Sequence, residues 1–203
     1  MNGKFMTIEE TTKYLWENSV EFTFKQNKQA DESFAWDDDI FTSTWFKKNN
    51  FKRLEKAKGL YWFSVKGLDI KDFFKLTPPE KFPTKGINFA ETSYKIYTLF
   101  SSNVYKKAND ELVFYNGQSE LIFNRIQTHF ALNNNKTGAL AIGKYHIPNK
   151  EFKVRIFHDQ MNFDGLNEEN KEYIKRLLNN KTGRESIESC WRIKYGWPIL
   201  CEK

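Results

Sequence analysis

Residues 111–129, ELVFYNGQSELIFNRIQTH, decide the fold of this chain because they combine two periodicities in one short stretch. The first residues form an apolar run typical of a strand, and Asn116-Gly117-Gln118 is expected to form a polar turn after it. The residues beyond the turn have helical spacing, with an apolar stripe made of Leu121, Ile122, Ile126 and Phe130. The stretch therefore predicts a strand, a turn and a helix in succession.

Two polar residues of the predicted helix, Arg125 and His129, are four positions apart. Side chains at this spacing lie on one face of a helix. The apolar stripe places the arginine and the histidine on a face that need not be buried against the core. A guanidinium group and an imidazole one turn apart suit the binding of a phosphate.

A second strand is predicted upstream, at residues 59–65, GLYWFSV. The two predicted strands each carry a tyrosine two residues from a glycine, in Gly59-Leu60-Tyr61 and in Tyr115-Asn116-Gly117. Two such strands followed by an arginine-bearing helix resemble the GIY-YIG nuclease superfamily. The chain departs from the family name at Asn116, where the family has isoleucine. It also separates the two tyrosines by 54 residues, where many members have a short hairpin.

The resemblance implies a set of site residues. It expects an arginine about ten residues after the second tyrosine, often a histidine one turn later, and a glutamate on a later helix. Arg125 and His129 match the first two positions. Glu188 matches the glutamate best, because Trp191 follows it by three residues and Pro198 by ten, and Glu185 is the fallback.

One position that the resemblance implies is not filled. An asparagine is expected just beyond Pro198, and Leu200 and Cys201 stand there instead. This absence keeps open the alternative of a DNA-binding module that has lost catalysis.

The implied chemistry is hydrolysis of a phosphodiester. Glu188 would hold one Mg²⁺ (or Mn²⁺), a hard cation that prefers oxygen ligands. Arg125 would bind the scissile phosphate and stabilise the transition state. Tyr61 is the candidate general base, provided that nearby positive charge lowers its pKa from the ordinary value near 10. His129 would accept a proton from Tyr61 or from water, and Tyr115 would orient the phosphate or the water.

Charge supports a nucleic-acid partner when the chain is divided at residue 58. Residues 1–58 hold ten Lys and Arg against ten Asp and Glu, so the formal net charge of +6 lies entirely in residues 59–203. A basic excess in one region is typical of proteins that bind phosphate backbones. We expect double-stranded DNA as the partner, with contacts from Asn116, Gln118, Lys136 and Lys144.

The implied fold is α+β, with a small, mostly antiparallel three-stranded sheet flanked by helices in the order β-β-α-β-α-α. Residues 59–203 would form the nuclease domain. Residues 66–110 would be an insertion between the two motif strands, with a strand or helical turn at 93–100. The third strand is expected at 152–157 and a helix at 167–180.

Residues 1–58 are expected to form an N-terminal extension that packs on the core or on a partner subunit. Its clearest element is a helix at 7–18, because Thr7 and Glu10 have the spacing of a capping box. The acidic triplet Asp37-Asp38-Asp39 is interpreted as a solvated turn or helix start rather than a metal site.

Several classes of protein are disfavoured by composition. No apolar run approaches the roughly 20 residues that span a bilayer, and the first residues lack the apolar stretch of a signal peptide. We therefore expect a cytoplasmic protein without a membrane partner. Cys190 and Cys201 lack the spacing of a zinc site and are expected to be reduced core residues.

The preferred hypothesis is a type II restriction endonuclease, because long insertions between the motif strands occur in that branch of the family. One active site per chain implies a homodimer or sequential nicking for cutting both strands. The alternatives are a repair or mobile-element nuclease, the silent DNA-binding module, and a protein–protein interaction domain rich in aromatic residues. The last of these would show no salt-sensitive affinity for DNA.

Overall fold

The computed structural model describes residues 5–28, 34–36, 40–49, 56–105, 110–131 and 138–202. Its centre is an antiparallel sheet with the strand order β2-β1-β5-β3-β4. The long strands are β1 (Val20–Lys28), β5 (Glu151–His158), β3 (Gly59–Lys66) and β4 (Glu111–Ser119). The short strand β2 (Phe34–Trp36) pairs with the end of β1. The α+β class is confirmed, and the sheet has more strands than the three expected.

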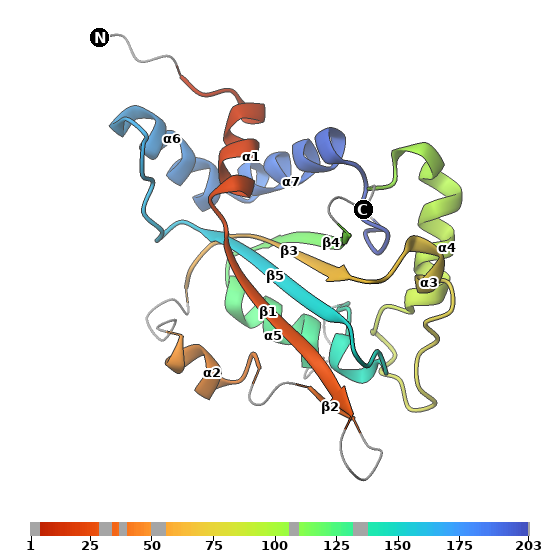
Figure 1. Ribbon diagram of the computed structural model, residues 1–203. Helices are drawn as coiled ribbons and strands as arrows, with labels where there is room; N and C mark the ends of the chain where they lie inside the picture. The colour runs from red at the N-terminus through yellow and green to blue at the C-terminus, as the bar shows by residue number, and fades with distance from the viewer. Residues whose placement is uncertain are drawn as a thin grey trace.

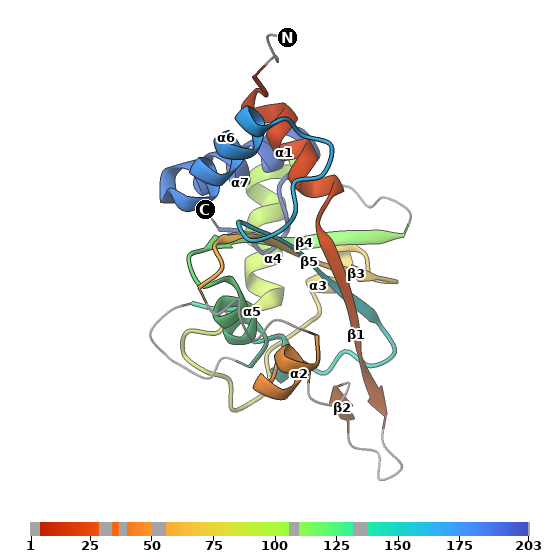
Figure 2. The ribbon, with the colours of Figure 1, turned by 90° about the vertical axis from the view of Figure 1, so that its left-hand side faces the viewer.

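Helices cover both faces of the sheet (Figure 1; Figure 2). On one face lie α1 (Ile8–Glu17), α6 (Glu168–Asn179) and α7 (Lys181–Tyr195). On the other lie α5 (Ile122–Ala131) and α2 (Ser43–Lys48), with the short 3₁₀ helix η3 (Ile142–Lys144) next to α5. The connection between β3 and β4 holds α3 (Ile70–Phe73), α4 (Phe89–Phe100) and η2 (Ser101–Asn103). Residues 93–100, expected as a strand or helical turn, thus belong to a helix.

Capping residues determine where several of the helices begin or end. Thr7 accepts from the backbone N of Glu10, whose carboxylate accepts from the backbone N of Thr7, so the predicted capping box of α1 is confirmed. Asn167 caps α6 with its side-chain oxygen, which accepts from the backbone N of Asn170. Asn180 ends α6 and caps α7, which makes the two helices a tight pair.

The N-terminal extension contributes to the sheet itself. β1 pairs with β5 from Val20 to Lys25, and α1 packs against α7. Leu15 on α1 and Phe24 on β1 are fully buried. The extension therefore supplies a strand and a core helix as well as packing on the core, which is the physical reason why the sheet exceeds three strands. The triplet Asp37-Asp38-Asp39 lies outside the described residues.

The predicted turn at Gly117 is wrong, because β4 continues through Asn116, Gly117 and Gln118 to Ser119. Tyr115–Ser119 of this strand pair in continuous register with Gly59–Phe63 of β3, and Tyr61 lies opposite Gly117. Gly59 is required for a similar reason, since a Cβ there would lie 2.0 Å from the carbonyl oxygen of Phe157 on β5. Both motif glycines thus serve close packing within the sheet.

The core is rich in aromatic side chains. Trp16 of α1 contacts Trp62 of β3 and Trp191 of α7, at 5.2 and 5.3 Å between ring centroids. Cys201 is a buried free thiol as expected, whereas Cys190 on α7 is half-exposed. No helix among the described residues is both long enough and apolar enough to cross a bilayer.

Candidate active site

Tyr61 of β3 and His129 of α5 meet beneath the sheet. The hydroxyl oxygen of Tyr61 lies 2.7 Å from Nε2 of His129, and both residues are buried. The backbone N of Leu140 donates to Nδ1 of the same ring at 3.2 Å. Because Nδ1 accepts, the neutral imidazole carries its proton on Nε2 and donates it to Tyr61. The histidine is therefore oriented as a donor to the tyrosine rather than as the proton acceptor that the sequence suggested.

Tyr115 and Arg125 complete this half of the site. The Tyr115 ring lies 4.8 Å from that of His129 and 6.2 Å from that of Tyr61. The Arg125 guanidinium is close enough to interact with the hydroxyls of Tyr61 and Tyr115, and it also donates to the carbonyl oxygen of Gly138 at 2.8 Å. The structure thus brings together four residues that are scattered over 69 positions of sequence.

Burial controls the protonation of these groups. It raises the pKa of Tyr61 well above its usual range, although Arg125 lowers it. It raises the pKa of Tyr115 to about 12. It lowers the pKa of His129 well below its usual range, and the positive charge of Arg125 lowers that pKa further. In the absence of ligands, both phenols and the imidazole are therefore neutral at pH 7, and Arg125 provides the positive charge.

Glu188 reaches the same place from α7, on the other face of the sheet. Its side chain is 16% exposed, and its charge acts on the pKa of both Tyr61 and Tyr115. One carboxylate oxygen, Oε1, accepts a hydrogen bond and ion pair from Arg192. Burial raises the pKa of Glu188, while Arg192 lowers it.

The fallback residue Glu185 is in a different environment. Its side chain is 49% exposed and pairs with Lys181 at 3.7 Å, as is typical of a surface helix. Of the two candidates, Glu188 is the one that lies with the tyrosines.

The position of β4 at the edge of the sheet explains how α5 and α7 can serve one site. Side chains alternate between the faces of a strand. Tyr115 and Gly117 face α5, whereas Asn116 between them faces α7 and bonds Arg192. Gly117 leaves room for Tyr61, because a Cβ at 117 would lie 2.4 Å from its hydroxyl oxygen. The site therefore straddles the edge of the sheet.

A pocket opens beside Arg125. It has a volume of about 300 Å³ and is lined by Gln118, Ser119, Leu121, Asn124, Arg125 and Thr128. All of its lining residues except Leu121 have polar side chains, and one of them carries a half-buried guanidinium group. Such a pocket can admit an anionic group to Arg125.

The residues fit a single divalent cation rather than an all-protein cage. Among the described residues, no group of three or more His, Cys, Asp and Glu side chains is arranged to hold a metal. Oε2 of Glu188 makes no hydrogen bond within the described part of the chain, so one carboxylate oxygen remains for a ligand. Mg²⁺ is commonly held by one or two carboxylates together with substrate phosphates and water, and this donor set agrees with that pattern.

The predicted surface contacts have mixed outcomes. Asn116 is 1% exposed and holds Arg192, so in this structure it is a core residue and is not placed to touch DNA. Gln118 is half-buried and accepts from Nε of Arg184 at 2.8 Å, although it also lines the pocket. Lys144 is exposed, next to α5. Lys136 lies outside the described residues.

His129 is fully buried, on a helix face that the sequence pattern did not require to be buried. Only Arg125, of the two residues predicted on that face, borders the pocket. The ring of His129 packs against the rings of Tyr61 and Phe63. The spacing of residues along the helix alone does not reveal this contact.

The sequence-based prediction of the site did not include some of its residues. Asn124 and Thr128 flank Arg125 at the pocket, and their spacing of one helical turn was a usable signal. Arg192 was also missed, although it lies four residues after Glu188 on the same helix.

Comparison with known proteins adds no assignment. A scan of protein-family models, a search of curated protein sequences and a search of solved structures each found no match to this chain. Function must therefore be argued from the geometry of the site.

Proposed function

We propose that this protein is a metal-dependent endonuclease that hydrolyses DNA phosphodiester bonds, of the GIY-YIG type and its type II restriction branch. The observation that carries the proposal is the convergence of Tyr61, Tyr115, Arg125, His129 and Glu188 at one edge of the sheet. Taken singly, each of these residues has an ordinary structural explanation. Their joint placement next to a polar pocket favours phosphoryl chemistry.

Each residue then has a role that follows from its surroundings. Arg125 binds the scissile phosphate from the pocket, with a planar cation that suits phosphate oxygens. The base would be the phenolate of Tyr61, formed when the phenol loses its proton to solvent, and it becomes a neutral phenol again on taking a proton from the attacking water. His129 donates to the Tyr61 oxygen and Arg125 lies beside it, so both groups stabilise that phenolate. Tyr115, stacked on Tyr61, orients the phosphate or the water.

Glu188 would hold Mg²⁺ or Mn²⁺ through its Oε2 oxygen. When bound, the cation would neutralise charge on the phosphate and on the leaving oxygen. The recognition surface proposed for double-stranded DNA includes Gln118 at the pocket and Lys144 beside α5. Cutting both strands with one site per chain requires a homodimer or two successive nicks.

The test is incubation of the purified protein with unmethylated phage DNA and Mg²⁺. We expect discrete fragments from the wild type and a loss of roughly 10²-fold or more in rate for Glu188→Gln, typical of removing a group that stabilises the transition state. Glu185→Gln is the matched control on the same helix and should cut at close to the wild-type rate. Equal loss in both variants would contradict the assignment of Glu188.

Two other outcomes separate the alternatives. A smear of products that depends on Glu188 would indicate a nonspecific or repair-type nuclease. Intact DNA, with salt-sensitive binding that ignores Mg²⁺, would indicate a DNA-binding module without catalysis. The high pKa of both phenols and the absence of the expected asparagine are the observations that favour this second candidate.

A further inference from the structure

Arg192 of α7 is a buried cation that binds the candidate metal ligand. Its residue is 7% exposed, and its Nη2 pairs with Oε1 of Glu188. Its Nε donates to the side-chain oxygen of Asn116 at 2.8 Å. The guanidinium therefore bridges β4 and the carboxylate, and its Nη2 also lies 3.5 Å from the backbone oxygen of Asn116.

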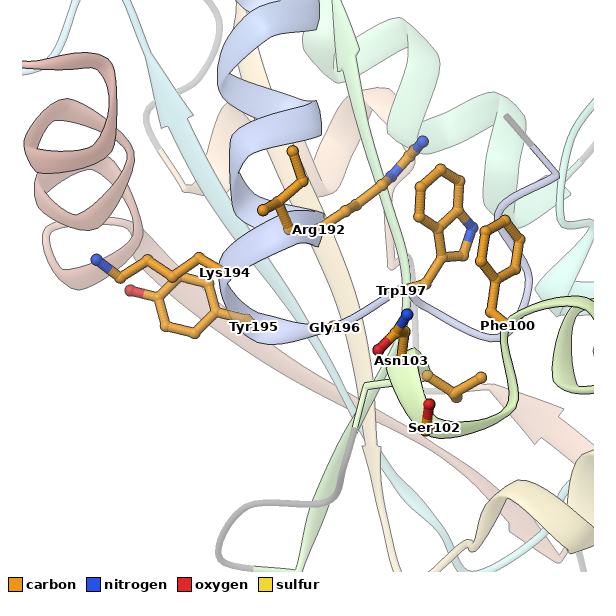
Figure 3. Close-up of a pocket in the computed structure, with 10 residues that line it drawn as sticks. Phe100, Ser102, Asn103, Arg192, Lys194, Tyr195, Gly196 and Trp197 are labelled. Atoms are coloured by element: carbon orange, nitrogen blue, oxygen red, sulfur yellow. The ribbon is translucent and has the colours of Figure 1, made fainter.

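Aromatic packing holds the guanidinium on a third side. Its central carbon lies 4.8 Å from the centroid of the Trp197 ring, and Phe100 stacks on Trp197 at 4.4 Å. Figure 3 shows the Arg192 side chain extending from α7 toward Trp197. A pocket of about 520 Å³ borders these residues. Three kinds of contact thus limit the freedom of a side chain that is normally flexible.

Asn116 is placed for this task. Its amide is buried, and its Nδ2 has no hydrogen-bond partner within the described residues. Burying an unpaired amide nitrogen is costly, so the orientation of this side chain is explained by its acceptor bond to Arg192. The thiol of Cys201 lies 3.4 Å from the same Asn116 oxygen and covers it. Cys201 is one of the two residues found where the sequence pattern led us to expect an asparagine.

We propose that Arg192, anchored by Asn116, is a positioning residue for Glu188 that holds Oε1 and leaves Oε2 for a divalent cation. This inference rests on the proposed function. The same guanidinium places a positive charge next to the bound cation, which repels it. Metal binding without DNA should therefore be weak, and the phosphates of DNA should strengthen it.

The two effects of Arg192 can be separated by substitution. Arg192→Lys keeps the charge but lacks the planar fork that reaches Asn116 and Glu188 together. Asn116→Leu keeps the volume and leaves Arg192 without its Nε acceptor. Arg192→Met removes both the charge and the fork. Arg184→Met is the matched control for metal binding, because Arg184 is a buried arginine of α7 that bonds Gln118 and Glu120 instead of Glu188.

The first readout is binding of Mn²⁺ alone, measured by electron paramagnetic resonance without DNA. We expect Arg192→Met to bind Mn²⁺ roughly tenfold or more tightly than the wild type, because a repelling charge next to the ion is gone. Arg192→Lys, Asn116→Leu and Arg184→Met should stay within about threefold of the wild type, because the charge beside Glu188 is kept. Glu188→Gln should abolish the site.

The second readout is the rate of DNA cleavage at saturating Mg²⁺. We expect losses of roughly tenfold or more in Arg192→Met, Arg192→Lys and Asn116→Leu, because a misplaced carboxylate loses catalytic orientation. Lys194→Met, which removes a cation of α7 that pairs with Glu9 away from the site, should cut at close to the wild-type rate. Circular dichroism of each variant checks that the fold is retained. If Arg192→Met fails to fold, Arg192→Gln, which also removes the charge, takes its place.

Particular results would overturn the inference. Wild-type rates in both Arg192→Lys and Asn116→Leu would show that positioning by this pair is not needed. Unchanged Mn²⁺ affinity in Arg192→Met, with a site that still depends on Glu188, would show that Arg192 does not act on the cation. If the wild type binds no Mn²⁺ through Glu188 and cuts no DNA, the proposed function fails and this inference fails with it.

Discussion

At the scale of single residues, the decisive pair is Tyr61 and His129, 68 positions apart in sequence and 2.7 Å apart in space. The sequence pattern nominated both residues correctly as neighbours in one site. It did not predict the burial of His129 or the direction of its hydrogen bond. The burial depends on packing against Tyr61 and Phe63, and the direction depends on the backbone N of Leu140, in a segment whose position no local pattern defines.

The burial of His129 predicts a pH dependence of stability. In the folded protein the pKa of His129 is well below its usual range near 6.5, so on acidification the unfolded chain takes up this proton first. The contribution of His129 to the unfolding free energy is therefore fully present above pH about 6.5. Below that pH it declines, by at most about 1.4 kcal/mol per pH unit. His158, whose pKa burial also lowers, acts in the same direction.

Urea unfolding at a series of pH values between 5 and 7.5 checks this prediction. The comparison is between the wild type and His129→Gln, which cannot bind the proton. The difference in unfolding free energy between the two should shrink as the pH falls. This difference isolates His129 from Glu188, whose raised pKa favours the folded state most strongly at low pH and acts in the opposite direction. A difference that is constant with pH would contradict the assignment.

At the scale of secondary-structure elements, the sequence predicted an element correctly where the residues that determine it lie close together in the chain. The spacing of a capping box predicted α1, and the strand expected at 152–157 and the helix expected at 167–180 correspond to β5 and α6. The prediction failed at Gly117, because a glycine flanked by polar residues has the composition of a turn. In the structure this glycine is needed for the approach of β3 to β4, a tertiary reason that composition does not contain.

Gly117→Ala should therefore damage the site and the sheet together. The new methyl group would lie 2.4 Å from the hydroxyl oxygen of Tyr61, so the ring must move and its bond to His129 is lost. We expect a loss of about 1–3 kcal/mol in unfolding free energy, as for other overpacked positions. Chemical denaturation measures it. Gly138→Ala is the control, because the nearest atom to its Cβ would be 3.9 Å away, and an equal loss there would refute the steric explanation.

At the scale of the whole molecule, the sequence-based prediction underestimated the structural role of the N-terminal extension, residues 1–58. The sequence marks its helix clearly, but strand partners far apart in sequence are not visible in a single chain. β1 pairs with β5, more than 120 residues later, and this pairing places residues 20–28 inside the sheet. The class of fold was predictable from the alternation of elements, whereas the strand order was not.

Residues 59–203 should consequently fail to fold alone. Removing the extension exposes the backbone edge of β5 and deprives the core of Leu15, Trp16 and Phe24. Each large apolar side chain contributes about 1.5–3 kcal/mol by burial, against a typical total stability of about 5–15 kcal/mol. Circular dichroism melting of the fragment should show no cooperative transition. Addition of residues 1–58 in trans should restore one, and a cooperative melt of the fragment alone would contradict the prediction.

The C-terminal segment has a further consequence for assembly. The backbone N of Leu200 donates to the carbonyl oxygen of Phe114, and the backbone N of Asn116 lies 3.4 Å from the Cys201 sulfur, so the outer rim of β4 is already occupied by the chain itself at these positions. An exposed sheet edge is a template on which another chain can add a strand. Here that template is blocked next to the site. In the proposed homodimer, the sheets of two copies therefore cannot join across Phe114 and Asn116, and contacts between the copies next to the site would be made by side chains.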